Sequence, residues 1–158
     1  RKLTEYGTQQ REKQKVKFVY GVMEKQFYKL YEEATRKEGV TGELLLQYLE
    51  RRLDNVIYRL GFGATRRQAR QIVSHGHILI NGKRVNIASY RVKQGDVITV
   101  KEDSKELALI KESVGQKTVP GWLSLEEGAL TAKVLENPGR DAVDFEVDEA
   151  MIIEFYSR

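Results

Sequence analysis

Arginine and lysine are concentrated in the middle of this 158-residue sequence, where they have few acidic neighbours. Residues 51–100 hold ten of these cations against two carboxylates, Asp54 and Asp96, and carry a net charge of +8. Residues 1–50 carry +2 and residues 101–158 carry −6. A guanidinium group pairs with phosphate through two parallel hydrogen bonds, and a face that meets only solvent ordinarily mixes both signs. The excess therefore predicts a nucleic-acid partner, with a solvated basic face as the alternative.

Signals for catalysis and metal binding are weak. The sequence has no cysteine, which excludes disulfides, thiolate zinc sites and cysteine nucleophiles, and it has no Ser-His-Asp set or paired carboxylates. His75 and His77 are poorly spaced for a metal, so we expect them to contact RNA or cap a helix end. The segment 61–66 begins like a dinucleotide fingerprint but follows a predicted helix and has Arg66 at the third glycine position. We expect a protein that is not an enzyme and uses no cofactor.

The apolar residues predict several helices and no membrane span. The chain is 41% hydrophobic, and no apolar run approaches the roughly 20 residues that a span requires. A short helix is expected near 9–17 in the polar, basic start of the sequence. Apolar spacing at three and four residues predicts further helices from about 22 to 36, over 43–60 and from Thr65 to His75. Thr65 and Gln68 form a capping box, in which each side chain accepts a hydrogen bond from the other residue's backbone N–H.

Strand signals follow the last of these helices. Residues 78–80 and 83–85 flank Asn81-Gly82, which predicts a two-residue type I′ hairpin, and 97–100 is again strand-like. We predict a helix over 104–112, a second hairpin from 122–125 and 130–135, a half-buried strand over 143–147 and a short helix from Asp148.

The polar side chains of the basic segment form the predicted RNA surface, since the apolar sides of helices 43–60 and 65–75 pack on the hairpin. The amides and Tyr90 are the groups expected to contact 2′-hydroxyls or base edges. Asp54 is expected to pair with Arg51, one helical turn back. The predicted RNA-binding residues are Arg52, Asn55, Arg59, Arg66, Arg67, Arg70, Gln71, His75, His77, Asn81, Lys83, Arg84, Tyr90 and Lys93, joined by the N-terminal residues Arg11, Lys13, Lys15 and Lys17.

Two further groups of side chains have alternative interpretations. Phe27, Tyr28 and Tyr31 are expected in the core of a helical lobe, the alternative being a platform on which RNA bases stack. The acidic last third of the chain suits a protein neighbour better than RNA, the alternative being a solvated face. The predicted protein-interface residues are Asp144, Glu146, Asp148 and Glu149.

Three motifs carry a resemblance to a known family: RLDNVIYRLG at 52–61, TRRQARQIVSHGH at 65–77 and NGKRVN at 81–86. They resemble the RNA-binding module named after small-subunit ribosomal protein four. Further segments extend the resemblance to the bacterial small-subunit (30S) ribosomal protein four family over nearly the whole chain: YG at 20–21, FY at 27–28, IASY at 87–90, KQGD at 93–96, WL at 122–123 and IEFYSR at 153–158. The family has a further N-terminal segment, which bears zinc-binding cysteines in many members, so zinc is expected only there.

The resemblance implies a structural protein of the cytoplasmic ribosome that binds small-subunit rRNA. It implies primary binding of 16S rRNA, nucleation of the 30S body during assembly, a role in decoding accuracy and autogenous translational repression. Its implied partners are the rRNA, its own mRNA and ribosomal protein five, with no membrane and a monomeric state when free. The alternatives are the RNA-binding module of an RNA-modifying enzyme, which would need a separate catalytic domain, or a ribosome-associated stress factor.

The expected fold class is α+β, with a helical lobe and an inserted RNA-binding module. Residues 1–48, with about 149–158, are expected to form the helical domain. Residues 49–148 are expected to form an α/β domain, whose RNA-binding module spans about 50–113. In that module two helices lie on a mostly antiparallel sheet and present a basic face.

Overall fold

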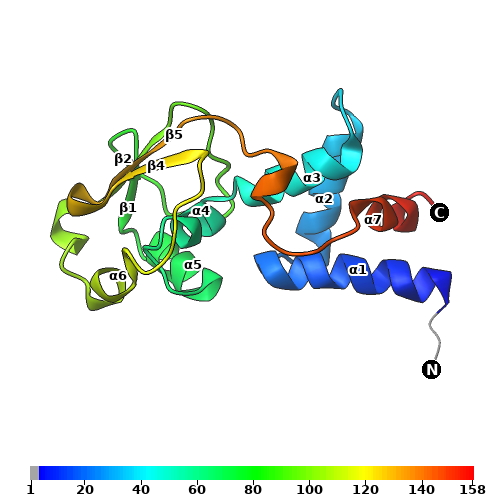
Figure 1. Cartoon of the computed structure of the whole chain (residues 1–158), viewed down its shortest axis with the longest axis horizontal. Helices are drawn as coiled ribbons and strands as arrows, with labels where there is room; N and C mark the ends of the chain where they lie inside the picture. The colour runs from blue at the N-terminus through cyan, green and yellow to red at the C-terminus, as the bar shows by residue number, and fades with distance from the viewer. Residues whose placement is uncertain (1–3) are drawn as a thin grey trace. The chain divides into compact units, whose positions relative to one another are not determined.

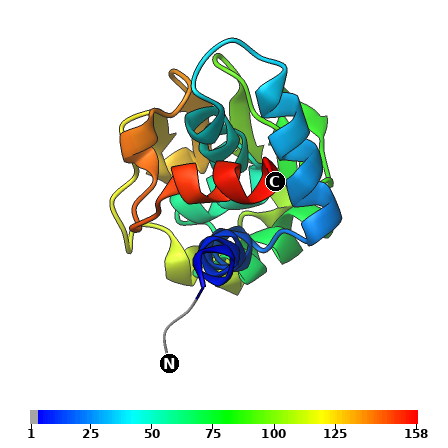
Figure 2. The same ribbon diagram turned by 90° about the vertical axis from the view of Figure 1, so that its right-hand side faces the viewer.

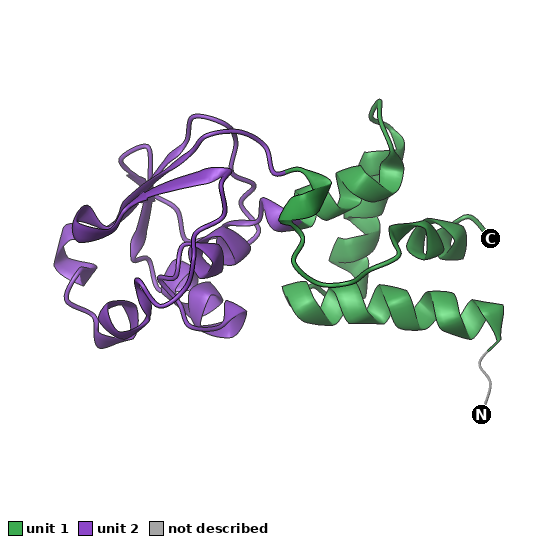
Figure 3. Ribbon diagram, viewed as in Figure 1, with its two compact units in different colours: residues 1–49, 139–158 green, residues 50–138 purple. Residues whose placement is uncertain are grey.

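The computed structural model describes residues 4–158, which divide into two compact units. The first unit is formed by residues 1–49 and 139–158, and the second by residues 50–138 (Figure 3). The chain enters the second unit once and then returns to the first, which therefore combines described residues 4–49 with residues 139–158. No helix of the described residues is long and apolar enough to span a membrane.

The first unit is built from helices (Figure 1). They are α1 (Glu5–Tyr20), α2 (Glu24–Thr35), α3 (Thr41–Glu50), whose last residue opens the second unit, and α7 (Glu149–Tyr156). Helix α1 starts where the Thr4 hydroxyl accepts a hydrogen bond from the Gly7 N–H at 3.0 Å, and it ends at Gly21, whose φ is 69°. The terminal helix α7 packs on α1 (Figure 2), so the last residues of the chain complete this core. Its fully buried members include Val16, Phe27, Leu45, Leu49 and Ile152.

The second unit is a five-stranded antiparallel sheet with three helices. The strands β1 (Ile78–Ile80), β2 (Lys83–Arg84), β3 (Val97–Val100), β4 (Leu123–Glu126) and β5 (Thr131–Val134) have the order β2-β1-β3-β5-β4. The helices are α4 (Leu53–Arg59), α5 (Arg66–Ser74) and α6 (Ala108–Ser113). Both predicted hairpins are confirmed, because β1 pairs with β2 and β4 pairs with β5. The fold class is therefore α+β, as expected.

The first hairpin has the turn that its sequence predicts. Asn81 and Gly82 have φ values of 52° and 84°, and two successive positive φ angles define the type I′ turn. Short 3₁₀ helices are also present: η1 (Glu102–Ser104), η2 (Glu127–Ala129) and η3 (Arg140–Ala142).

The prediction of one helix over 43–60 is wrong, because the helix is interrupted at residues 51–52, between α3 and α4. Arg52 is extended, with φ −62° and ψ 139°, and forms an isolated antiparallel bridge with Arg91. The Val92 N–H donates to the Arg51 carbonyl at 2.9 Å, and the Leu53 N–H donates to the Tyr90 carbonyl at 2.7 Å. The apolar stripe continues on both sides of the break, so its periodicity does not reveal that a distant segment pairs with the backbone here.

Two other segments differ from the predicted elements. No strand forms over 143–147; Val143 and Val147 are nevertheless buried in the core of the first unit, because alternate side chains of an irregular segment pack there without a sheet. The helix predicted over 104–112 begins only at Ala108, after the turn η1. The N-terminal helix is longer than predicted, and the helix from Asp148 is confirmed as α7.

Candidate nucleic-acid interface

Helix α5 presents the basic surface predicted from the sequence. The Thr65 hydroxyl accepts a hydrogen bond from the Gln68 N–H at 3.1 Å, which confirms half of the capping box. The Gln68 side chain accepts instead from the Ala64 N–H at 3.1 Å, one residue before the expected donor. Ala69, Ile72 and Val73 form the buried side of the helix. The side chains of Arg67, Arg70 and Gln71 are consequently exposed.

The turn before α5 holds this helix close to α4. A Cβ atom on Gly63 would lie 2.7 Å from the Ala69 backbone nitrogen, a distance that real Cβ atoms essentially never show. Glycine is therefore required at this position, since the loop backbone passes directly over the first turns of α5.

The far end of α5 meets β2 and forms a second cluster of cationic and imidazole groups. Gly76 follows the helix with φ +81°, and a Cβ there would lie 2.7 Å from Arg84 Nε. The Arg84 guanidinium thus rests against the glycine and is close enough to His77 to influence its charge. The ring centroids of His75 and His77 are 6.4 Å apart. His75, Lys83 and Arg84 are all exposed. The contact of Arg84 with Gly76 brings β2 next to the end of α5. We call the exposed polar side chains of these two elements and of His75, which follows α5, the α5–β2 surface; they are Arg67, Arg70, Gln71, His75, Lys83 and Arg84.

His77 is held more tightly than its neighbour. Its Nδ1 lies 2.7 Å from the Ser104 hydroxyl. Partial burial lowers the pKa of His77, and the nearby positive charges of His75, Lys101 and Arg84 lower it further, while Asp103 opposes them. The imidazole is therefore neutral at neutral pH and supplies a hydrogen-bonding group.

The side chains of Asn81 and Tyr90 both form hydrogen bonds with the buried carboxylate of Asp96, which is 2% exposed. Asn81 Nδ2 and the Tyr90 hydroxyl each donate to Asp96 at 3.0 Å, and the Lys93 N–H also donates to it at 3.0 Å. The other end of the Asn81 amide accepts from the Val97 N–H at 2.9 Å. Burial raises the pKa of Tyr90, and its bond to Asp96 adds to the effect. These groups order the loops around the hairpin, while the Lys93 side chain is exposed.

The expectation that Arg52, Asn55 and Arg59 lie on the surface is wrong. Their exposed fractions are 3%, 1% and 7%. Arg59 forms two hydrogen bonds to the Glu50 carboxylate, at 2.7 and 3.1 Å, and Asn55 Nδ2 donates to the Glu50 carbonyl and carboxylate. Glu50 is completely buried. The polar side of α4 therefore faces the protein interior. The buried Glu50 carboxylate, at the end of α3, neutralises the positive charge of Arg59 there.

Asp54 has a different main partner from the one predicted. Arg52 donates to both of its carboxylate oxygens, at 3.1 and 3.0 Å, whereas Arg51 Nε donates to the Val92 carbonyl at 2.8 Å. Arg70 Nε lies 4.0 Å from Asp54 on the exposed side of the pair. The change of partner follows from the extended backbone at Arg52, which no helical spacing describes.

A group of cations surrounds the ring of Tyr58. Arg66 Cζ lies 4.4 Å from the ring centroid, Arg59 Cζ lies at 5.8 Å and Lys117 Nζ at 3.2 Å. Arg66 also donates to Asn55 Oδ1 at 2.9 Å and is half-buried. Lys117 lies in the acidic third of the chain and was not among the predicted RNA-binding residues, because only the fold brings it to this ring.

The N-terminal basic residues have partners within the first unit. Lys13 is 6% exposed, so the expectation that it is available to RNA is wrong; its amine lies 2.6 Å from Glu24 and 4.3 Å from the Phe155 ring centroid. Lys17 also pairs with Glu24, at 3.1 Å, and Lys15 pairs with Glu12 at 2.8 Å. Arg11 is exposed.

The Glu24 carboxylate is the acceptor around which these lysines gather. Partial burial alone would raise the pKa of Glu24, but hydrogen bonds from Lys13, Tyr156 and Lys17 lower it overall. Phe27, Tyr28 and Tyr31 belong to the same aromatic cluster, in which Tyr31 and Tyr156 have ring centroids 4.6 Å apart. These rings pack against one another inside the helical unit, and Tyr28 is exposed at its edge.

The acidic residues predicted as a protein interface are mostly on the surface. Asp144, Glu146 and Asp148 are exposed, and Glu149 is half-buried and pairs with Arg140. Their role in a protein contact stays a prediction. Among residues 4–158 no group of three or more histidine, aspartate or glutamate side chains is arranged to hold a metal ion.

Comparison with known proteins finds matches along the entire chain. Residues 51–98 match the family described as the S4 domain, and residues 1–50 match the ribosomal protein S4/S9 N-terminal domain. A protein of Fusobacterium nucleatum called small ribosomal subunit protein uS4 is 64% identical over 158 residues, covering 100% of this chain and 81% of that protein. Two more relatives have similar names: uS4A of Symbiobacterium thermophilum, 57% identical, and uS4 of Thermoanaerobacter sp., 55% identical, each aligned to 100% of this chain and 77% of its own length. None of the three is named as an enzyme.

Proposed function

Because the chain belongs to the uS4 family of small ribosomal subunit proteins, we propose that the α5–β2 surface is where it binds small-subunit rRNA. As a member of that family, the chain is a structural, rRNA-binding component of the small subunit. The observation that carries the proposal is the exposure of Arg67, Arg70 and Arg84 on two elements that meet at Gly76. Exposed guanidinium groups held on a rigid helix and hairpin suit the phosphates of folded RNA.

The surface binds by charge and shape. Each phosphate that a guanidinium neutralises releases counterions, so affinity falls as salt rises. The exposed Gln71 amide and His75 imidazole supply hydrogen bonds to 2′-hydroxyls, which distinguish RNA from DNA. The buried arginines of α4 do not reach the RNA; they fix the position of α4, against which α5 packs.

Finer roles follow from the family resemblance. We propose that this chain is a primary binder of 16S rRNA that nucleates assembly of the 30S body, and that it represses translation of its own mRNA through the same surface. We also propose that it contacts ribosomal protein five and so influences decoding accuracy. The exposed Asp144, Glu146 and Asp148 support a protein contact, because their negative charge disfavours RNA.

The test is the salt dependence of binding to a small-subunit rRNA fragment. The double variant Arg67→Ala/Arg84→Ala should bind at least tenfold more weakly at low salt, and the slope of log affinity against log salt should fall by roughly 1.4–1.8. Its melting temperature should stay close to that of the unmodified chain, because both side chains are exposed. Lys111→Ala is the matched control, since this exposed lysine on α6 pairs with Glu106, which precedes that helix. Unchanged affinity in the double variant would contradict the assignment.

A further inference from the structure

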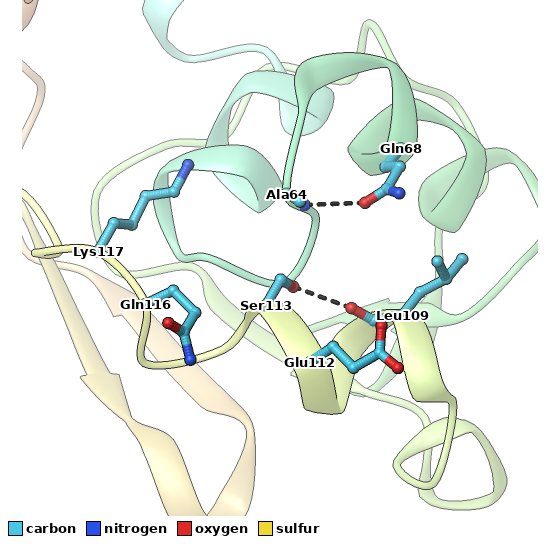
Figure 4. A pocket seen from close by; sticks show the side chains of 7 residues that line it. All are labelled: Ala64, Gln68, Leu109, Glu112, Ser113, Gln116 and Lys117. Atoms are coloured by element: carbon cyan, nitrogen blue, oxygen red, sulfur yellow. Dashed lines mark hydrogen bonds between the residues drawn. The ribbon is translucent and has the colours of Figure 1, made fainter.

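A cleft opens between α5 and α6, within the second unit (Figure 4). Its volume is about 360 Å³, at the lower end of the roughly 300–1,000 Å³ of small-ligand sites. The walls come from the turn before α5, from α5 itself, from α6 and from the loop after α6. The cleft is therefore formed partly by residues beyond 51–98, the segment that matches the RNA-binding domain family.

One side of the cleft is cationic. Lys117 lines it, and the amine sits 3.2 Å from the Tyr58 ring centroid, against which Arg66 also stacks. Burial lowers the pKa of Lys117, and the charges of Arg59 and Arg66 lower it further, while Tyr58 opposes them. Arg59 is bound to the Glu50 carboxylate and Arg66 to the Asn55 amide oxygen, and both guanidinium groups add positive charge at the Tyr58 ring. An anion placed beside Lys117 would thus meet a concentrated positive charge.

The opposite side carries groups suited to a flat, polar ring. Leu109 is an apolar side chain that remains 38% exposed, and the Glu112 carboxylate and the Gln68 amide lie near it (Figure 4). Gln68 uses its oxygen to accept from the Ala64 N–H, so its NH₂ group is the end that remains to donate. Ser113 also lines the cleft, and its hydroxyl oxygen lies 2.7 Å from the Gly61 carbonyl oxygen and 2.9 Å from that of Phe62, so its single proton is used within the protein.

We propose that this cleft binds one unstacked nucleotide of RNA, with the phosphate at Lys117 and the base against Leu109. Sequence-specific RNA recognition uses such splayed-out bases, read along their hydrogen-bonding edges. The Glu112 carboxylate accepts from an exocyclic amine, as carboxylates do with cytosine, and Gln68 donates to a ring nitrogen or carbonyl of the same edge. The site therefore favours a base with an exocyclic amine, namely adenine, cytosine or guanine, over uracil, which has none. The inference rests on the proposed RNA-binding function and adds a specific contact to it.

The first test observes the cleft directly. Nuclear magnetic resonance spectra of the full chain are recorded while hexamers of adenylate, cytidylate or uridylate, or inorganic phosphate alone, are added. The proposal predicts that the adenylate and cytidylate hexamers shift the side-chain amide signal of Gln68 and the backbone signals of Ala64 and Ser113, and that uridylate shifts them much less. It is overturned if these signals stay fixed with every hexamer, or if phosphate alone reproduces the shifts.

The second test uses variants in binding to the rRNA fragment. Lys117→Gln should weaken binding roughly tenfold, as expected for loss of one charged hydrogen bond, and reduce the salt slope by about 0.7. Leu109→Ala should weaken binding without changing that slope, because it removes a contact with the base. The control is again Lys111→Ala, with thermal unfolding recorded for all variants. If Arg67→Ala/Arg84→Ala weakens binding while Lys117→Gln and Leu109→Ala do not, the cleft proposal alone is overturned. If the unmodified chain fails to bind, the proposed function itself is wrong.

Discussion

Helices α4 and α5 are neighbours with similar basic residues, yet they use them in opposite ways. Arg59 on α4 is 7% exposed and bound to Glu50, whereas Arg67 and Arg70 on α5 are exposed. The difference lies in the acidic residues. Two carboxylates, Glu50 and Asp54, are close to α4, while α5 contains none. Arginines in a sequence are therefore buried where a carboxylate is buried beside them, as Glu50 is beside Arg59. They stay exposed where they approach a carboxylate only from the edge of the helix, as Arg70 approaches Asp54.

The largest expected effect comes from breaking the buried pair of α4. Glu50→Ala leaves Arg59 and Asn55 without the carboxylate that binds them, and an uncompensated buried charge costs about 3–5 kcal/mol of unfolding free energy. Chemical denaturation measures this loss. The companion double variant Glu50→Leu/Arg59→Met should recover most of the stability, because it removes both charges. Glu50→Ala within 1 kcal/mol of the unmodified chain would show that the pair does not hold α4 in place.

A smaller effect is expected from the turn between the two helices. Gly63→Ala places a methyl group 2.7 Å from the Ala69 backbone nitrogen, and the resulting overpacking should cost about 1–3 kcal/mol. RNA affinity should fall as well, since α5 must move. Gly121→Ala is the control, because a Cβ there meets nothing within 4 Å. Equal stability of these two variants would contradict the close approach of the turn to α5.

The smallest effect concerns pH. The pKa of His77 is lowered in the folded state, so folding favours the neutral imidazole. The neutral His77 side chain contributes its full stabilisation above about pH 6.5, the pKa of histidine in the unfolded chain. This stabilisation is lost as the pH falls from there through the lower pKa of His77 in the folded protein. We expect a modest decrease in melting temperature from pH 7 to pH 5 that is reduced in His77→Gln. The lowered pKa of Glu24 acts in the same direction but below about pH 4.3. An identical pH profile for His77→Gln would contradict this assignment.

Features that depend on residues close together in the sequence were predicted correctly. The Asn81-Gly82 turn and the Thr65 hydroxyl cap depend on residues within a few positions of one another, and both are present. The exposed arginines of α5 follow equally well from the helical spacing of Ala69, Ile72 and Val73, which are buried.

Contacts between distant segments were not predictable from spacing. The break at Arg52 depends on backbone pairing with residues 90–92, and it turns Arg59 toward Glu50. The position of Lys117 on the Tyr58 ring joins residues 59 positions apart in the sequence. The alternation at Val143 and Val147 correctly marks buried side chains but does not distinguish a strand from an irregular segment lying on helices.

The difference between the two helices can be measured on the arginine side chains themselves. In the intact chain, the Nε–Hε resonances of arginine report separately on each guanidinium group during titration with the small-subunit rRNA fragment. We predict that the signals of Arg67, Arg70 and Arg84 shift as RNA is added, while those of Arg52 and Arg59 keep their positions. Shifts at Arg52 and Arg59, with Arg67, Arg70 and Arg84 unchanged, would contradict the assignment of the RNA-binding surface.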